Sequence, residues 1–322
     1  MTNSSRQEFK KIRVAGVQAA PVFLDLNGTT EKACELILEA GRKGAELIAF
    51  PEAFIPTFPN WYETLAESPK ARELDKRLFL ESVEMDGEHM KAIAEACAKA
   101  NINAVVGINE RSPMTNGSMH NTQVHITRDG IIAGKHQKYV PTTGERQVHT
   151  PGKTGHYNTF RTNFGVVSGL ICGENSNMLG MYAAAVNYPV VHVGSWPMYF
   201  HPYFHMQHAI LTATAGLAYS LKCFVVNAVS RITPEYIDAV AETEEQRVFL
   251  EEQRVFLEEQ RAYLPGASIL DPSGNLIIDG TGMEEELLFA DINLEDVIIP
   301  KLIIDTAGHY NRPELFAPLF QK

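Results

Sequence analysis

Short apolar runs with high β propensity recur from one end of this 322-residue chain to the other, and segments with helical periodicity lie between several of them. Strands that alternate with helices are typical of α/β folds, because the helices cover the faces of the sheet. We expect helices over residues 29–44, 88–99 and 205–221. The expected strands cover residues 14–17, 47–50, 104–108, 122–126, 166–171, 190–193, 224–228, 267–270 and 287–290.

Two turn signals argue against a purely parallel sheet. Asp129-Gly130 and the segment 271–275 each lie between strand-like runs, and residues of this kind form hairpin turns. We therefore predict a mixed sheet or two packed sheets. No Pro- or Ser-rich linker divides the chain, so we predict a single domain over residues 1–322, with a flexible N-terminus at 1–9 and a C-terminal tail at 300–322.

The composition excludes several classes of protein. The chain is 45% hydrophobic and 21% charged, as in ordinary globular proteins, and its net charge of −11 argues against binding to nucleic acid or anionic membranes. No apolar run has the length of a membrane-spanning helix, and no signal-peptide pattern is visible. The four cysteines are widely spaced without a CxxC pair, so we expect reduced thiols in a cytoplasmic protein.

One segment repeats with a period of seven residues. Residues 244–250 recur identically as 251–257, and with two changes as 258–264. The composition favours helix, so we predict a helical heptad-repeat segment over 240–264, with Arg247 and Glu251 as an i,i+4 pair. Such a helix either contacts another subunit or is a lengthened surface helix without further consequence.

Cys172 is the first candidate for catalysis. It directly follows the apolar run 166–171 and precedes Gly173. A thiol at the point where a strand opens into a glycine turn can point into a cleft, beside free backbone N–H groups. Buried free cysteines are also common in protein cores, so this position alone does not establish a nucleophile.

Three charged residues lie in comparable settings. Glu52 follows the apolar run 47–50, where apolar surroundings would raise a carboxyl pKa and suit it to proton transfer; an exposed strand-end carboxylate is the alternative. Lys138 lies in a basic segment and is either catalytic or part of a solvated turn. Glu145 is either a surface residue in a salt bridge or a second carboxylate oriented toward the site.

Together these residue types are consistent with one chemistry. A carboxylate takes the thiol proton, and an ammonium group stabilises the negative charge that develops on the substrate. No histidine is needed. Neither GxGxxG nor GxxxxGK[ST] occurs, so no nucleotide cofactor is indicated.

Three strings in this order resemble the signatures of the nitrilase (carbon–nitrogen hydrolase) superfamily: Phe50-Pro51-Glu52, residues 136–142 with Glu145-Arg146, and residues 172–175. The tail 308–314 resembles the C-terminal motif of the nitrilase branch proper. The likeness covers roughly residues 10 to 315, and the combination is far more specific than any single motif. Many members have tryptophan after the nucleophile, where this chain has Gly173, which changes the expected shape of the pocket more than the chemistry.

The resemblance implies a role for each candidate. Cys172 would be the nucleophile, Glu52 the general base and acid, and Lys138 the group that stabilises the tetrahedral intermediate. Glu145 would orient the others, and the backbone N–H of Gly173 would join the oxyanion site. The resemblance also implies a four-layer α-β-β-α sandwich that pairs into dimers and often into larger spirals or filaments.

The activity implied by the resemblance is hydrolysis of an organic nitrile to a carboxylic acid and ammonia, without a cofactor. An amidase, an N-carbamoyl hydrolase or a cyanide-degrading enzyme would use the same site, and a scaffold protein without activity is a further alternative. The tail 308–314 favours nitriles.

Aromatic residues after two of the expected strands are candidates for the substrate pocket, with ordinary loop packing as the alternative. They are Phe58 and Trp61, which follow Glu52, and Trp196 and Tyr199, which follow the strand expected to end at residue 193.

Three histidines suggest a metal site that we discount. His201, His205 and His208 fall at i, i+4 and i+7, so one face of a helix would present them all. No acidic ligand or HExxH pattern accompanies them, so we predict no metal and place these histidines at a subunit interface or a pocket rim.

Overall fold

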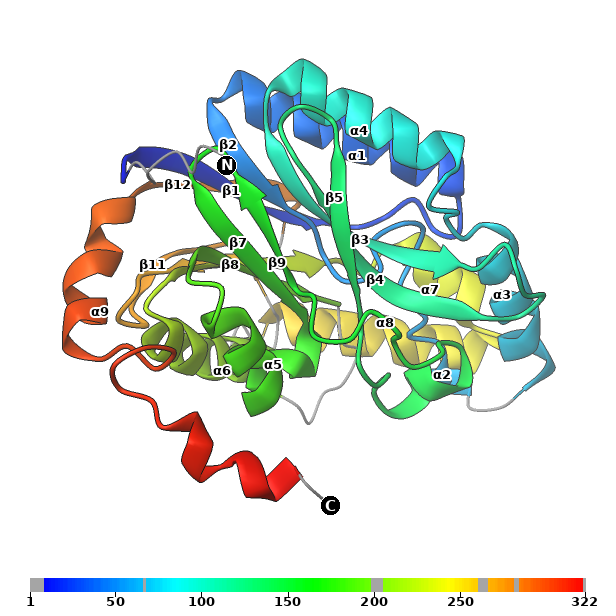
Figure 1. Ribbon diagram of the computed structural model, residues 1–322. Coiled ribbons are helices and arrows are strands. Elements are labelled where there is room, and N and C mark those ends of the chain that lie inside the picture. Colours follow the sequence, from blue (N-terminus) through cyan, green and yellow to red (C-terminus); the bar gives the residue numbers. More distant parts are fainter. Residues whose placement is uncertain (1–8, 66–67, 198–204, 260–265, 281–283, 321–322) are drawn as a thin grey trace.

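The computed structural model describes residues 9–65, 68–197, 205–259, 266–280 and 284–320, and its strands form a mixed sheet with two halves (Figure 1). One half has the order β12 (Glu286–Asn293), β1 (Lys11–Ala19), β2 (Ala45–Ala49), β3 (Asn103–Arg111), β4 (Met119–Ile126) and β5 (Ile132–Gln137). The other has the order β11 (Leu276–Asp279), β10 (Ser268–Leu270), β9 (Phe224–Ser230), β8 (Pro189–Trp196), β7 (Gly165–Ile171) and β6 (Thr159–Thr162).

The two halves meet along an edge and then pack face to face. Their hydrogen-bonded junction is short, because β1 pairs with β9 only at Gln18–Val229 and Ala19–Ser230. One apolar core contains side chains from β1, β2 and β3 together with side chains from β7, β8 and β9, so it fills the space between the halves. Its members include Val14, Leu47, Val105, Val167, Val193 and Val226.

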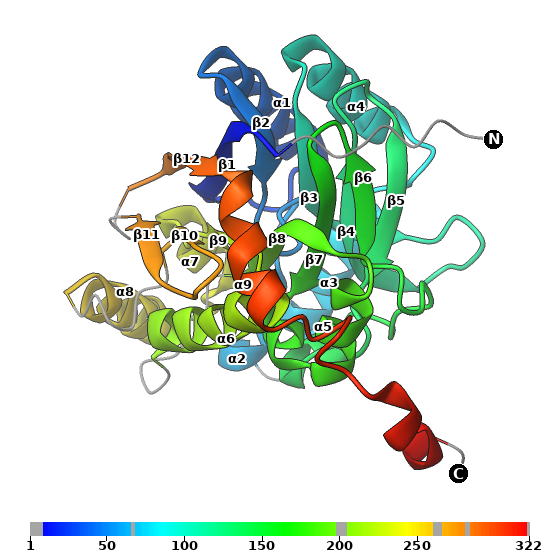
Figure 2. The ribbon, with the colours of Figure 1, turned by 60° about the vertical axis from the view of Figure 1, so that its left-hand side comes forward.

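Helices cover the two outer faces. The apolar sides of α1 (Leu26–Arg42) and α4 (Glu88–Ala100) pack on the β1–β4 half, whereas α5 (Met178–Ala185) and α6 (Met206–Leu221) pack on the β7–β10 half. Figures 1 and 2 show these pairs on opposite sides of the strands. The expected four-layer α-β-β-α sandwich is therefore confirmed.

Further helices lie at one end of the layers and at the C-terminus. A separate apolar cluster joins side chains of α2 (Tyr62–Leu65), α3 (Pro69–Leu80), α7 (Pro234–Val240) and α8 (Glu244–Glu259). The C-terminal helix α9 (Ile298–Ile303) precedes a segment that extends away from the body of the molecule (Figure 2). Among the described residues, no helix combines the length and the apolar character needed to cross a membrane.

Hydrogen bonds decide where some helices and strands begin and end, which the apolar pattern of the sequence did not show. Helix α1 begins three residues earlier than expected, because the Asp25 side chain accepts a hydrogen bond from the Gly28 backbone and caps the first turn. Strand β8 continues past residue 193 to Trp196, because its last residues pair with β9. Both expected hairpin turns are present, and the positive φ angles of Gly130 (74°) and Gly274 (84°) explain why glycine occupies them.

The heptad segment is helical, but its bounds and pairing differ from the prediction. The segment forms one helix, α8, which starts at Glu244 instead of residue 240, because residue 240 is the last residue of the preceding helix α7. Residues 260–264 lie outside the described residues. Each arginine forms a salt bridge with the glutamate three residues before it, in the pairs Glu244–Arg247 and Glu251–Arg254. The expected i,i+4 pair had joined Arg247 to Glu251, four residues after it. Leu250 is buried against α7, whereas Val248 and Phe249 are exposed.

The parallel strands bring their carboxyl ends to one edge of the layers. Strands β1, β2 and β3 run parallel to each other, and so do β7, β8 and β9. The turn that carries Glu52 follows β2, and Cys172 follows β7 directly. Side chains at such an edge converge on a common space, as ligand sites do in many α/β proteins.

We expect Gly107 to be required for the position of the Glu52 turn. A Cβ atom at Gly107, in β3, would lie 1.9 Å from the carbonyl oxygen of Pro51 and 2.9 Å from the nitrogen of Ala53. Gly107→Ala should therefore lower the free energy of unfolding by about 3 kcal/mol, the upper end of the usual cost of overpacking. Gly134→Ala is the matched control, because a Cβ atom there meets nothing within 4 Å.

Chemical denaturation of both variants measures the difference. Gly134→Ala should stay within about 1 kcal/mol of the wild type, since alanine also restricts the unfolded chain. Equal stability of the two variants would contradict the close approach of β3 to the Glu52 turn.

Candidate active site

Lys138 lies between two carboxylates. Its ammonium nitrogen donates hydrogen bonds to Glu52 Oε1 and Glu145 Oε2, each at 2.6 Å. All three side chains are almost completely buried. The third N–H of the ammonium has no hydrogen-bond partner among the described residues, so it is available to a bound molecule.

Glu52 is held by one oxygen only. Asn121, in β4, donates to Glu52 Oε1 at 2.6 Å, and Lys138 donates to the same atom. The other oxygen, Oε2, is buried without a hydrogen-bond partner in the described part of the chain. Burial raises the pKa of Glu52 to about 7, with the Lys138 ammonium opposing and the Glu145 carboxylate adding to the rise.

Glu145 accepts hydrogen bonds on both of its oxygens. It lies on the short 3₁₀ helix Thr143–Gln147, and its Oε2 also accepts the backbone N–H of Thr142 at 2.9 Å. Its Oε1 accepts from Asn121 at 2.8 Å and contacts His149 Nδ1 at 3.0 Å. Burial by itself would raise the pKa of Glu145, but Lys138 and His149 lower it far below the ordinary value. Glu145 is therefore an anion at neutral pH.

Cys172 has a backbone conformation that is rare for a side-chain-bearing residue. It begins a 3₁₀ turn directly after β7 with a φ angle of 51°, and it is 5% exposed. Burial raises the pKa of its thiol strongly; the charge of Glu52 adds to the rise, whereas Lys138 and a hydrogen bond from the Gly173 backbone oppose it. The thiol is therefore protonated at neutral pH and needs a base to become a thiolate.

The turn after Cys172 is held from behind by two side chains. Asn175 Nδ2 donates to the carbonyl oxygen of Cys172 at 2.8 Å, and its Oδ1 contacts His192 Nε2 at 2.9 Å. Glu174 Oε2 accepts the backbone N–H of Ile171 at 3.0 Å and contacts His136 Nε2 at 2.8 Å. These contacts fix the strained backbone on which the thiol is carried.

A cavity of about 360 Å³ opens beside the cluster. Cys172 and Glu52 do not line it, but Gly173 does, and a Cβ atom at Gly173 would meet nothing within 4 Å. The missing side chain therefore leaves open space next to the nucleophile turn. The lining residues are Lys138, Tyr139, Val140, Thr142, Gly173, Glu174, Ser176 and Asn177.

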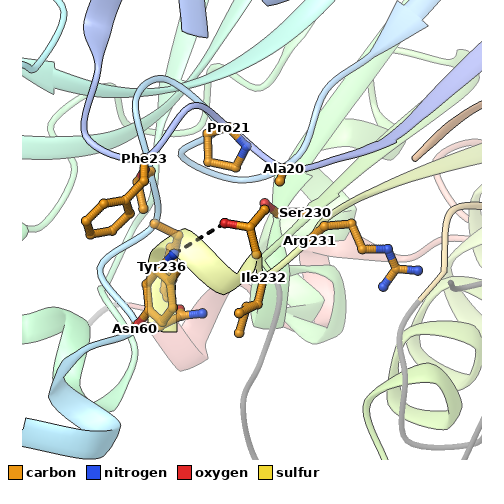
Figure 3. A pocket seen from close by; sticks show the side chains of 11 residues that line it. Ala20, Pro21, Phe23, Asn60, Ser230, Arg231, Ile232 and Tyr236 are labelled. Atoms are coloured by element: carbon orange, nitrogen blue, oxygen red, sulfur yellow. Dashed lines mark hydrogen bonds between the residues drawn. The ribbon is translucent and has the colours of Figure 1, made fainter. Parts of the chain in front are cut away.

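The aromatic residues predicted to line the substrate pocket lie in different parts of the structure. Trp196 packs in one cluster with Cys172, and its Nε1 donates to Asn227. The centroid of the Phe58 ring lies 6.0 Å from Lys138 Nζ, and Phe58 also borders a second, small cavity of about 20 Å³. Figure 3 shows other residues that line this cavity, among them Asn60 and Tyr236. Trp61 belongs to a different apolar cluster from Cys172: it is completely buried with α2, α3 and α7 side chains, and its Nε1 donates to Asp75. Tyr199 lies outside the described residues.

The histidines considered for a metal site do not form one in the described part of the chain. His205 is the residue before α6, His208 lies one turn further on the exposed side, and His201 is outside the described residues. Among the described residues, no group of three or more His, Cys, Asp or Glu side chains has the geometry to hold a metal ion.

Our reading of the sequence missed Asn121, Asn109 and His149. Asn121 touches both glutamates, and His149 joins Glu145 to Asn109. The sequence signal was the number of polar residues on the strand expected over 122–126; the structure adds that the whole run 119–126 is buried. Buried polar side chains need partners, so such a strand indicates a polar network.

The chain is similar to known proteins over most of its length. The sequence profile of the carbon–nitrogen hydrolase family matches residues 13–298. The chain is 34% identical over 317 residues to a nitrilase from Bacillus sp. (strain OxB-1). This match covers 98% of this chain and 89% of the relative. It is also 34% identical over 318 residues to an aliphatic nitrilase from Rhodococcus rhodochrous, with 96% and 82% covered.

Solved structures share the fold. The crystal structure of a carbon–nitrogen hydrolase from Helicobacter pylori G27 superposes with a TM-score of 0.73 at 16% identity, with 98% of this chain and 99% of that chain covered. At this identity the likeness concerns the fold alone. The profile match and the 34% identical relatives show that this chain belongs to the carbon–nitrogen hydrolase family.

Proposed function

We propose that this protein is a nitrilase, which hydrolyses an organic nitrile to a carboxylic acid and ammonia with Cys172 as the nucleophile. The observation that carries the proposal is the buried cluster of Glu52, Lys138 and Glu145, whose charges act on the thiol of Cys172. The names of the 34% identical relatives support a nitrile as the substrate.

In the first half of the reaction, Glu52 takes the proton of the Cys172 thiol. Its Oε2 is the unpartnered oxygen, and its raised pKa suits it to exchange a proton near neutrality. The sulfur then attacks the nitrile carbon, one C–N π bond breaks, and the nitrogen receives a proton from Glu52. The product is a thioimidate on Cys172.

In the second half, two water molecules release the products. Glu52 removes a proton from the first water as it adds to the thioimidate carbon, and the third N–H of Lys138 and the backbone N–H of Gly173 stabilise the tetrahedral species. Protonation of the nitrogen expels ammonia and leaves a thioester. The second water cleaves the thioester, which gives the carboxylic acid and restores the thiol. In sum, one nitrile and two waters give one acid and one ammonia.

The same site would also accept an amide, an N-carbamoyl compound or cyanide. The resemblance of the tail 308–314 to the nitrilase branch favours a nitrile. In the structure, Asn311 of this tail donates to the Tyr182 hydroxyl on α5 at 2.8 Å, so the tail is tied to the helix that follows the nucleophile turn. Ammonia release from a nitrile and from its matching amide distinguishes the two substrate classes.

We also propose that the protein self-associates through the face formed by α5, α9 and the C-terminal segment. Exposed apolar patches of this kind mark interaction surfaces. The described residues that expose large apolar side chains there are Met178, Leu179, Tyr182, Ile299, Leu302, Ile303, Leu315, Phe316, Leu319 and Phe320.

A cytoplasmic location is consistent with the cysteines. Cys34, Cys97, Cys172 and Cys223 are all free. Free thiols are kept reduced most readily in such a compartment, and a reduced Cys172 is what the proposed chemistry requires.

Cys172→Ala should abolish ammonia release from nitriles, because no other thiol lies at the cluster. Wild-type protein incubated with substrate should also gain the mass of an acyl group on the Cys172 peptide. Cys34→Ala is the matched control, since Cys34 lies on α1 and should be dispensable. Ammonia release by Cys172→Ala at the wild-type rate would end the assignment.

The pH profile of kcat/KM should have its acid limb near pH 7. Glu52 must be ionised in the free enzyme to accept the thiol proton, and burial raises its pKa to about 7. The rate should therefore fall about tenfold for each pH unit below that value and level off above it. Glu52→Gln should lower kcat/KM by roughly 10²–10⁴-fold at all pH values. A wild-type profile that is flat from pH 5 to 8 would exclude Glu52 as the base.

Charged residues on the apolar face should reduce assembly. The double variant Met178→Glu with Leu179→Glu places two carboxylates on α5, where burial in an interface would be costly. Light scattering at equal concentration should show a smaller particle than the wild type. Met114→Glu, at an equally exposed position outside the face, is the control. An unchanged particle size in the double variant would argue against this face.

A further inference from the structure

The orientation of the Asn109 amide reveals where one hydrogen of His149 lies. Asn109 Nδ2 donates to the carbonyl oxygens of Ala53, Ile55 and Thr57, at 3.3, 3.1 and 2.9 Å. Turning the amide over would aim its oxygen at three other oxygens, so Oδ1 faces the opposite way. There it contacts His149 Nε2 at 2.8 Å. An amide oxygen only accepts, so Nε2 carries a hydrogen.

The other ring nitrogen of His149 faces an acceptor as well. Nδ1 lies 3.0 Å from Glu145 Oε1. Glu145 already receives hydrogen bonds from Lys138, Asn121 and the backbone of Thr142, which is the environment of an ionised carboxylate. A carboxylate only accepts, so Nδ1 carries a hydrogen too. A histidine with hydrogens on both nitrogens is a cation.

We propose that His149 is a buried imidazolium and a positioning residue, whose charge offsets Glu145 so that Lys138 can keep Glu52 ionised. The inference rests on the proposed roles of Glu52 and Cys172. With His149 charged, two cations face two carboxylates, and the cluster is neutral when Glu52 is in its basic form. Without that charge, one cation faces two carboxylates, and the balance shifts toward protonated Glu52.

The surroundings of His149 make its charge effective. The side chain is buried, so water does not screen it. Among the described residues, Glu145 is the ionisable group in contact with His149, and Lys138 and Glu52 lie one contact further on. A change in the charge of residue 149 therefore acts on Glu52 through Glu145 and Lys138.

His149→Gln removes the charge while keeping a polar side chain that can still donate to Glu145 or Asn109. We expect the acid limb of the kcat/KM profile to move to a pH that is higher by roughly half to one unit. Both kcat/KM and the rate of Cys172 alkylation by iodoacetamide should then fall about three- to tenfold at pH 6 and approach wild-type values at pH 9. Peptide mass spectrometry follows Cys172 separately from the other cysteines.

His120→Gln is the matched control. His120 is also buried on the β4 side of the site, but its Nδ1 contacts the carbonyl oxygen of Thr150 instead of a carboxylate of the cluster. The acid limb of the kcat/KM profile of His120→Gln should stay at the wild-type position. An unmoved limb in His149→Gln, or an equal shift in His120→Gln, would overturn the proposal.

Nitrogen NMR of wild-type protein labelled with ¹⁵N-histidine tests the charge without any variant. At pH 7 the ring of His149, assigned through its contacts with Asn109, should carry hydrogens on both nitrogens; one bare nitrogen would refute the inference. The NMR and alkylation measurements use no substrate. They therefore decide this inference even if the wild-type protein releases no ammonia from nitriles, which would refute only the proposed function.

Discussion

A single ammonium group between two buried carboxylates organises the site. Each of these charges would be costly alone in the interior, and each is stable there because Lys138 bonds both Glu52 and Glu145. The two carboxylates nevertheless differ. Glu52 has one oxygen without a hydrogen-bond partner among the described residues, and burial raises its pKa. Glu145 is also buried, but Lys138 and His149 lower its pKa. The same cluster therefore contains one exchangeable base and one permanent anion.

The fold supplies this cluster from separate parts of the chain. Glu52 follows β2, Asn121 lies in β4 and Cys172 follows β7, so the site depends on both halves of the sheet. Gln123 links the halves behind it, because its amide donates to Ser195 Oγ on β8, which in turn donates to the carbonyl oxygen of Phe50. This buried polar crosslink joins β4 of one half to β8 of the other, so it helps to fix how the two halves are placed relative to each other.

Much of the architecture could be read from the sequence. The expected strands all lie in the sheet and the three expected helices are present, because their apolar patterns are long and regular. Strands β5 and β11 were expected only as unnamed runs after the two hairpin turns, and the short strand β6 was missed because two of its four residues are threonine and one is arginine. Element bounds also needed the structure: the cap at Asp25 and the pairing of Trp196 with β9 depend on contacts rather than on periodicity.

The sequence by itself determined which chemical groups are available, because each strand end carries its own thiol, carboxylate or ammonium group whatever surrounds it. Tertiary structure alone decided that Lys138 bonds both Glu52 and Glu145, that Trp61 and Cys172 pack in different clusters, and that Asn121 and His149 join the site. The physical reason is that a pKa, a hydrogen-bond direction and a buried charge depend on atoms brought close in space from distant positions in the chain, and periodicity along one segment carries no record of them.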